Sequence, residues 1–267
     1  MDVFDVLSGD SPVVLAQPHG GTFVPDDLNR RLNPTGRGLD DTDWHISRLY
    51  EGLLPGATVV KSNVHRYVID ANRDPAGHSL YPGQNTTTLC PLTDFDGVDI
   101  WEAGQAPSPD EVESRRQSFH APYHAALAQE LARVHARYGI AVLFDCHSIR
   151  STIPFLFDGE LPVYNVGTNL GQTCDPDIER LTHQTCLTAL PDSTVLNGRF
   201  KGGWTTRHYG QPQNQYHAIQ METSQRAYMD EAAPWTFRPE TAAQPRAVLQ
   251  KILTQLDQFA RSRATAT

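Results

Sequence analysis

The sequence contains few cysteines and no long apolar run. Its four cysteines are far apart and form no C-x-x-C pair, so neither a zinc ribbon nor a redox motif is expected. No segment approaches the roughly 20 apolar residues of a membrane span. The opening residues MDVFDVLSGDSP lack the basic and apolar regions of a secretory signal. We therefore expect a cytoplasmic protein with reduced cysteines and no membrane partner.

Basic side chains are scarce relative to acidic ones. The 22 lysines and arginines oppose 31 aspartates and glutamates, which gives a formal net charge of −9. A negative field repels phosphate groups, so nucleic acid is not an expected partner.

The chain also lacks internal repeats, low-complexity segments and a recognisable linker. Hydrophobic residues make up 39% and charged residues 20% of its 267 residues, which is typical of a globular protein. We predict a single domain over residues 1–267. The composition leaves open whether the protein is a monomer or a small homo-oligomer.

Predicted strands alternate with predicted helices along the chain. Short apolar runs predict strands at residues 12–16, 57–60, 66–69, 140–144, 161–166, 193–196 and 217–222. Helical spacing predicts helices at residues 41–54, 108–138, 175–189 and 242–261. Residues 75–107 are rich in glycine, proline and threonine, and we expect them to be irregular and to cover a site. This order predicts an α/β fold with a mixed, mostly parallel sheet and helices on both faces.

Three of the predicted strands end at side chains that bind metals or transfer protons. His19 follows the first strand, His147 follows the central strand, and Glu222 ends a late strand. Ligands bind at the carboxyl ends of the strands in such sheets, so these side chains could share one cleft. Two imidazoles, one carboxylate and an open position make up a catalytic zinc site.

The acidic ligand is sought near the start of the helix that follows His19. Asp43 is the first choice, Asp41 the second, and Asp40 lies beside them. The same aspartates could instead cap the helix. Asp145 is expected to support the site rather than to bind the metal. Imidazole and carboxylate ligands suit zinc, but also cobalt, manganese or iron.

Two other chemistries are disfavoured. Cys146 and His147 could suggest a thiol protease pair, but adjacent residues of a strand point to opposite faces, so a thiolate and its base would not meet. The glycine pairs at 20–21 and 202–203 lack the spacing and the lysine of a phosphate-binding loop.

Asparagine and arginine side chains point to an anionic substrate. Asn72 and Arg73 are adjacent, and together they offer donors that suit a carboxylate. Arg73 could equally pair with a nearby aspartate. Arg199 and Arg207 lie in the glycine-containing segment GRFKGGWTTRHYG, which could line a pocket or be an ordinary solvated loop.

Six motifs occur in a fixed order along the chain: PHGGTFVP, DDTDWHISRLY, IDANRDP, FDCHS, RFKGGWTTRHYG and QMETS. Together they resemble the N-formylglutamate amidohydrolase family, over residues 12–230. The resemblance implies a fold similar to the zinc carboxypeptidases, described as phosphorylase/hydrolase-like. It also implies zinc-dependent hydrolysis of N-formyl-L-glutamate to formate and L-glutamate, the last step of a histidine degradation route.

The resemblance also implies roles for individual residues. His19 and His147 would be the first and last metal ligands, and Glu222 would be the general base. Asn72 and Arg73 would bind a substrate carboxylate. The wider carboxypeptidase group has an acidic ligand three residues after the first histidine, where this chain has a threonine. The resemblance therefore leaves the third ligand open among Asp40, Asp41 and Asp43, with Asp43 the first choice.

A dicarboxylate substrate needs a second cationic contact. We expect Arg207 to make it, with Arg199 or Arg66 as the next choices. The main alternative is a metallo-amidohydrolase or carboxypeptidase-like enzyme that acts on another N-acyl amino acid. A different class of answer is a non-catalytic protein of the same fold that binds an amino acid or a metal.

Overall fold

A seven-stranded mixed sheet forms the centre of the protein. The computed structural model describes residues 2–80 and 82–264. The strands are β1 (Phe4–Leu7), β2 (Val13–Gln17), β3 (Thr58–Ser62), β4 (Ala141–Ile149), β5 (Tyr164–Gly167), β6 (Thr194–Leu196) and β7 (Tyr216–Ser224). Their order in the sheet is β1-β3-β2-β4-β7-β5-β6. Strands β3, β2, β4 and β7 run parallel, whereas β1 and β5 pair antiparallel with their neighbours β3 and β7.

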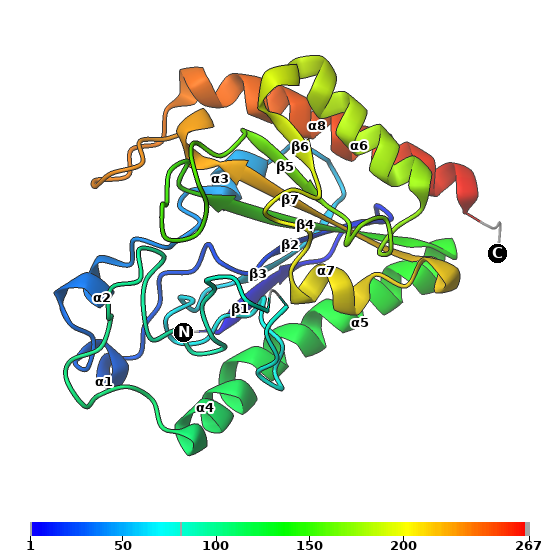
Figure 1. The fold of residues 1–267 in the computed structure, drawn as a ribbon. Coiled ribbons are helices and arrows are strands. Elements are labelled where there is room, and N and C mark those ends of the chain that lie inside the picture. The colour runs from blue at the N-terminus through cyan, green and yellow to red at the C-terminus, as the bar shows by residue number, and fades with distance from the viewer. Residues whose placement is uncertain (1, 81, 265–267) are drawn as a thin grey trace.

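Helices cover both faces of this sheet (Figure 1). One face packs against α3 (Ile46–Tyr50), α6 (Pro176–Ala189) and α8 (Pro239–Arg263). The other face packs against α5 (Ala121–Tyr138) and α7 (Trp204–Tyr209). The predicted α/β fold, with a mixed sheet between two helical layers, is confirmed.

Shorter helices lie at the edges of these layers. They are α1 (Asp26–Asn29), α2 (Pro34–Gly38), α4 (Pro109–Arg115), the π-helical η1 (Arg116–His120), and the 3-10 turns η2 (Pro191–Ser193), η3 (Pro212–Asn214) and η4 (Gln225–Ala227). Helix α4 continues through η1 into α5, so the helix predicted at residues 108–138 is interrupted by one wider turn. Within the described part of the chain, no helix has both the length and the apolar character of a membrane span.

The two faces of the sheet are buried in separate cores. In β2, Val13 and Leu15 pack on the side of α8, whereas Val14 and Ala16 pack on the side of α5. Successive strand residues point to opposite faces, so a strand covered on both sides must be apolar throughout. This explains the continuous apolar runs of the central strands.

The helix predicted at residues 41–54 is much shorter than expected. Only α3 is helical there, and the residues before it form turns. His45 precedes the helix with a φ of 60° and is its N-cap, so the alternative that the aspartates cap this helix is wrong. The side chain of Asp43 instead accepts a hydrogen bond from the backbone of Ser148 in β4, at 3.1 Å. This contact joins residues that are far apart in the sequence, and it holds Asp43 outside a helix although the local spacing of apolar residues favours one.

The strand predicted at residues 66–69 is also wrong. These residues form a turn in which the backbone N–H of Val68 donates to the carbonyl of His65. The apolar side chains of Tyr67 and Val68 fill two small cores beneath the outer loops, which is why they mimic a strand. Conversely, β1 was not predicted, because three of its four residues are exposed and its sequence has no run of buried apolar residues.

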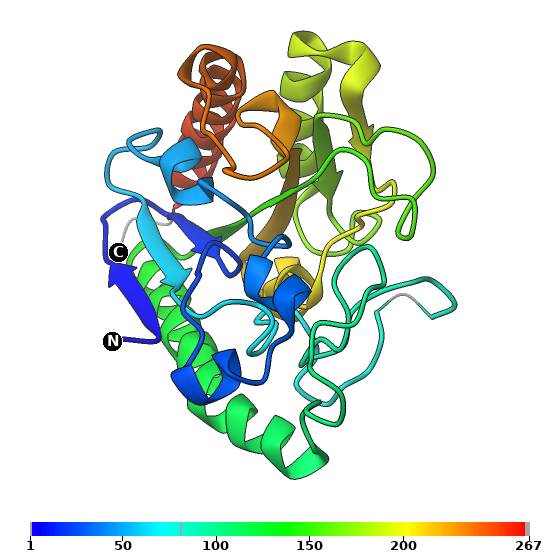
Figure 2. The same ribbon diagram turned by 90° about the vertical axis from the view of Figure 1, so that its left-hand side faces the viewer.

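Strands β4 and β7 are longer than the apolar runs that predicted them. His147 and Glu222 therefore lie within these strands, and they are register partners on neighbouring strands. Between β3 and α4, the described residues form only turns, bends and isolated bridges, as expected for residues 75–107. Figure 2 shows this long segment beside the loop that carries Arg199, which hydrogen-bonds the carbonyl of Asn85.

Candidate active site

Two histidines and one aspartate meet where β2 and β4 end. His19 lies two residues after β2, Asp43 lies in the turn before α3, and His147 lies in β4. The Nδ1 atoms of the two histidines are 3.1 Å apart. Asp43 Oδ2 is 3.5 Å from His147 Nδ1 and 3.9 Å from His19 Nδ1. All three side chains are buried, and they form a group that could hold a metal ion.

A second carboxylate supports each histidine from behind. Asp70 Oδ1 lies 2.7 Å from His19 Nε2, and Asp145 Oδ1 lies 3.0 Å from His147 Nε2. In His19, Nε2–H donates to Asp70, which leaves the Nδ1 lone pair directed inward. Nε2 of His147 also lies 3.0 Å from the side-chain nitrogen of Asn72. Asp145 precedes His147 by two residues in one strand, so the two side chains share a face. This position fits the expectation that Asp145 supports the site.

The donor set fits a divalent cation. Two ring nitrogens 3.1 Å apart and a carboxylate oxygen 3.5 Å from one of them place three potential ligand atoms close together in a buried space. Nitrogen and oxygen ligands in this combination suit zinc and related metals. Burial lowers the pKa of His19 to about 4, so its imidazole is neutral at pH 7 and available as a ligand.

Buried carboxylates surround this group. Asp70, Asp145 and Glu222 join Asp43, and Arg66 is the fully buried cation among them. Burial disfavours the charged form of His147, but Asp145 and Asp43 outweigh it and hold its pKa well above the usual value. The site therefore favours added positive charge.

Glu222 lies beside the metal-binding group on the neighbouring strand. It is the register partner of His147, and its Oε2 accepts a hydrogen bond from Gln220 at 3.1 Å. Burial raises the pKa of Glu222 to about 8, although the positive charges of His147 and Arg66 oppose this shift. A carboxyl group with a raised pKa beside a metal-binding group is suited to proton transfer.

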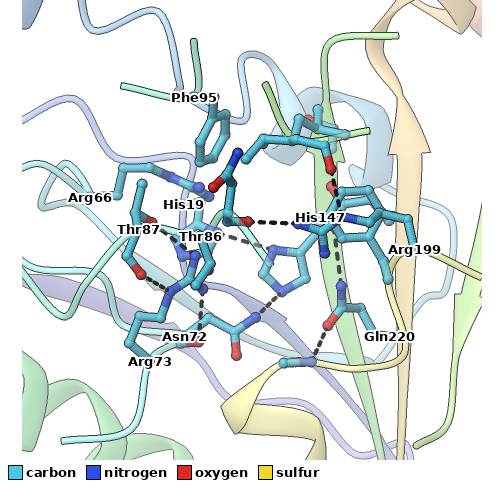
Figure 3. A pocket seen from close by; sticks show the side chains of 17 residues that line it. His19, Arg66, Asn72, Arg73, Thr86, Thr87, Phe95, His147, Arg199 and Gln220 are labelled. Carbon is cyan, nitrogen blue, oxygen red and sulfur yellow. Dashed lines mark hydrogen bonds between the residues drawn. The ribbon is translucent and has the colours of Figure 1, made fainter. Parts of the chain in front are cut away.

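One cavity connects these groups with several cationic and polar side chains (Figure 3). Its polar lining residues are His19, Arg66, Asn72, Arg73, Asn85, Thr86, Thr87, His147, Ser148, Arg199, Gln220 and Glu222. The sequence had suggested most of these residues separately, and the fold brings them to one place.

Arg73 lines the cavity and is also paired with an aspartate, so both roles considered from the sequence are compatible. Its Nε and Nη2 donate to the backbone and side chain of Thr87, each at 2.9 Å. Its Nη1 lies 3.6 Å from Asp70 Oδ2. Asn72 accepts a hydrogen bond from the backbone of Thr205 at 2.9 Å.

Arg66 lies closer to the metal-binding group than the sequence suggested. Its Nη2 donates to Asp43 Oδ1 at 3.2 Å, and its guanidinium lies 4.8 Å from the centre of the Phe95 ring. Its Nε is buried and has no hydrogen-bond partner among the residues that the structure describes. Arg66 therefore has a donor that a substrate could use.

Arg199 and Arg207 occupy different places. Arg199 lines the cavity, and it donates to the carbonyls of Leu156 and Asn85, both at 2.9 Å. Arg207 donates to the carbonyls of Gly202 and Leu80. Within residues 2–80 and 82–264, it is not one of the side chains that line this cavity.

The two other candidate acidic ligands lie outside the metal-binding group. Asp41 is buried, but its Oδ2 accepts a hydrogen bond from the backbone of Phe95 at 2.8 Å. Burial raises its pKa to about 7. Asp40 lines a separate small pocket near Arg150. Of the three aspartates, Asp43 is the one that meets the histidines.

The sequence reasoning missed three contributors to the site. Asp70 belongs to the motif IDANRDP, so the same motif could have indicated it. Gln220 precedes Glu222 by two residues, and alternation along a strand could have placed both on one face. Thr87 carries no recognisable signal, because it lies in the long irregular segment.

The chain is similar to proteins of known family. The family model for N-formylglutamate amidohydrolase matches residues 11–229. The chain is 43% identical over 263 residues to the N-formylglutamate deformylase of Pseudomonas aeruginosa, covering 98% of both chains. It is also 43% identical to the N-formylglutamate deformylase of Pseudomonas putida, over 95% of both chains.

A solved structure shares the fold. The crystal structure of N-formylglutamate amidohydrolase from Ralstonia eutropha JMP134 superposes with a TM-score of 0.80. The sequence identity is 24%, and the match covers 98% of this chain and 99% of the other. The sheet and both helical layers are therefore shared with that protein.

The support that Asp145 gives to His147 can be tested through metal affinity. We expect Asp145→Asn to weaken zinc binding about 10- to 100-fold, because loss of the carboxylate reduces the basicity and orientation of the imidazole. The dissociation constant is measured by competition with a fluorescent chelator. Asp177→Asn, on the exposed surface of α6, is the matched control. Equal zinc affinity in both variants would contradict a supporting role for Asp145.

Proposed function

The chain belongs to the N-formylglutamate amidohydrolase family, and we propose that it hydrolyses N-formyl-L-glutamate to formate and L-glutamate. One observation carries this proposal: a single cavity contains a metal-binding group, a buried carboxyl group and several guanidinium groups. We propose that this reaction is the last step of a histidine degradation route.

The substrate is an amide that carries two carboxylates. Its hydrolysis requires activated water, a group that transfers protons, and cationic contacts for both carboxylates. The overall charge of −9 repels a dianion at long range. The arginines of the cavity must therefore attract the substrate locally.

We propose that His19, Asp43 and His147 hold one zinc ion. Such an ion would act as a Lewis acid: it would lower the pKa of water toward neutrality and polarise a carbonyl group. The two imidazoles and the carboxylate hold it, while Asp70 and Asp145 keep the imidazoles oriented. Cobalt, manganese and iron suit the same ligands.

Glu222 is the proposed general base. Its carboxylate takes a proton from the attacking water as the water oxygen bonds to the formyl carbon. It then delivers this proton to the amide nitrogen as the carbon–nitrogen bond breaks, which releases L-glutamate. Its burial beside His147 places this proton transfer away from bulk solvent.

The guanidinium groups stabilise developing charge and bind the substrate carboxylates in this proposal. Arg66 lines the cavity next to Asp43, and its positive charge suits the negative charge that develops on the formyl oxygen. Arg73, with Asn72 beside it, binds one substrate carboxylate. Arg199, which lines the cavity, binds the other in preference to Arg207.

We also propose that the protein acts in the cytoplasm. Cys90, Cys146, Cys174 and Cys186 are buried free thiols. Thiols are kept reduced in that compartment, whereas secreted proteins usually pair them.

The reaction is tested by measuring formate release from N-formyl-L-glutamate. Zinc-loaded protein should release formate, a chelated aliquot should not, and added zinc should restore the activity. N-formyl-L-aspartate and N-acetyl-L-glutamate are assayed in parallel. Release from one of these alone would favour the alternative of another N-acyl substrate. Substrate binding without any turnover would indicate a non-catalytic protein.

The role of Glu222 is tested with Glu222→Gln, which keeps the size of the side chain. We expect turnover to fall about 10²- to 10⁴-fold with zinc content unchanged. A base must be ionised, so wild-type kcat/KM should rise with pH up to the raised pKa of about 8 and level off above it. This rise should disappear in the variant. Glu160→Gln, at an exposed position, is the control, and near-normal turnover of zinc-loaded Glu222→Gln would refute the assignment.

The carboxylate contacts are tested with single arginine variants. Arg73→Ala and Arg199→Ala should each lower kcat/KM by roughly 30-fold or more, since a broken buried charge pair commonly costs about 2–5 kcal/mol. Arg207→Ala should have a smaller effect. Arg116→Ala, at a partly exposed position away from the cavity, serves as the control. If Arg207→Ala lowered kcat/KM more than Arg199→Ala did, Arg207 would be the residue that binds the second substrate carboxylate.

A further inference from the structure

Two histidines outside the metal-binding group hold the segment that carries Asn72 and Arg73. His120 ends η1 and His124 lies in the first turns of α5, so they are one helical turn apart. Both side chains are buried. The six motifs that carry the family resemblance do not include them.

Each histidine contacts a backbone carbonyl on one side of Asn72. His124 Nε2 lies 2.7 Å from the carbonyl oxygen of Ala71. His120 Nε2 lies 3.1 Å from the carbonyl oxygen of Arg73. A carbonyl only accepts, so both Nε2 atoms are donors. Burial lowers the pKa of His124 to about 3, which keeps it a neutral donor at pH 7.

The π-helical turn η1 contributes to this arrangement. Residues four apart on a helix lie on one face, so His120 and His124 approach the same backbone segment together. Wider turns of this kind are rare and occur often at functional sites. Here the wide turn ends at His120, where the helix meets the Asn72 segment.

Helix α7 holds the same segment from the other side. The backbone N–H of Thr205 donates to Asn72 Oδ1 at 2.9 Å. The ring of Trp204 packs 4.7 Å from that of His124 and 5.4 Å from that of His120. A Cβ at Gly203 would lie 2.3 Å from Asn72 Nδ2, so only glycine allows this close approach.

We propose that His120 and His124 are positioning residues that hold Asn72 and Arg73 in place for a substrate carboxylate. Without these donors, the buried carbonyl of Ala71 and the partly buried contact at the carbonyl of Arg73 would lose their partners, and the segment between them could shift. A displaced Arg73 would no longer present its guanidinium at the same point of the cavity. The identity of the carboxylate rests on the proposed function, whereas the support of the backbone does not.

The matched control is another histidine of the same helix. His135 Nε2 lies 3.1 Å from the carbonyl of Asn214, and its ring stacks on Tyr216. It therefore makes the same kind of contact away from the site. The test compares His124→Leu, His120→Leu and His135→Leu in zinc-loaded protein. His124→Gln is the rescue variant, because a glutamine amide can donate to the Ala71 carbonyl.

Two readouts separate positioning from general destabilisation. We expect His124→Leu to lower kcat/KM for N-formyl-L-glutamate about 10- to 100-fold, mainly through KM, because small displacements of binding groups are costly. One of the two monoamides of this substrate lacks the carboxylate that Arg73 binds, and its kcat/KM should change little. Hydrogen exchange of a peptide spanning residues 70–74 should accelerate. His120→Leu should act in the same direction with a smaller effect, since its contact is longer.

The controls decide the outcome. His135→Leu should resemble the wild type in both readouts, and His124→Gln should recover most of the lost kcat/KM. Equal losses for the diacid and both monoamides, or exchange that accelerates throughout α5, would overturn the proposal in favour of a purely structural role. Unchanged exchange at residues 70–74 in both leucine variants would also overturn it. Absence of formate release by wild type would refute the proposed function, while the exchange data would still decide the positioning role.

Discussion

The site depends on a buried row of four side chains: Asp70, His19, His147 and Asp145. Asp70 accepts a hydrogen bond from His19, Asp145 lies 3.0 Å from His147 Nε2, and the Nδ1 atoms of the two histidines are 3.1 Å apart. Asp43 adds a carboxylate oxygen to the same space. Buried carboxylates around two imidazoles favour positive charge among them. This electrostatic environment suits the binding of a metal ion.

The parallel strands bring this row together. Asp70 follows β3, His19 follows β2, and His147 and Glu222 lie at the same level of β4 and β7. These strands are neighbours in the sheet and run in one direction, so their carboxyl ends form a common edge. The long irregular segment before α4 and the loop of Arg199 then close the cavity, through the contact of Arg199 with Asn85.

The sequence predicted the parts of the site whose signals are local. A histidine after a buried strand indicates a site because such a strand delivers its next residues to the edge of the sheet. Asp43 was chosen before Asp41 and Asp40 on its place in the chain, and the structure brings Asp43 to the histidines. The helix at residues 41–54 was overestimated because the contact between Asp43 and Ser148 depends on β4, about a hundred residues later in the chain. No local sequence pattern indicates that Arg66 belongs to the site, because its burial against Phe95 arises only in the folded chain.

By itself, the sequence determined the alternation of strands and helices, the two-sided burial of the central strands and the residue types of the site. These properties follow directly from the types of residues and their spacing along the chain. Only the tertiary structure decided that Arg199 lines the cavity, that Asp70 contacts His19, and that His120 and His124 contact the carbonyls on either side of Asn72. These contacts join segments that are far apart along the chain or that turn back on themselves, and their geometry depends on packing that no local pattern records.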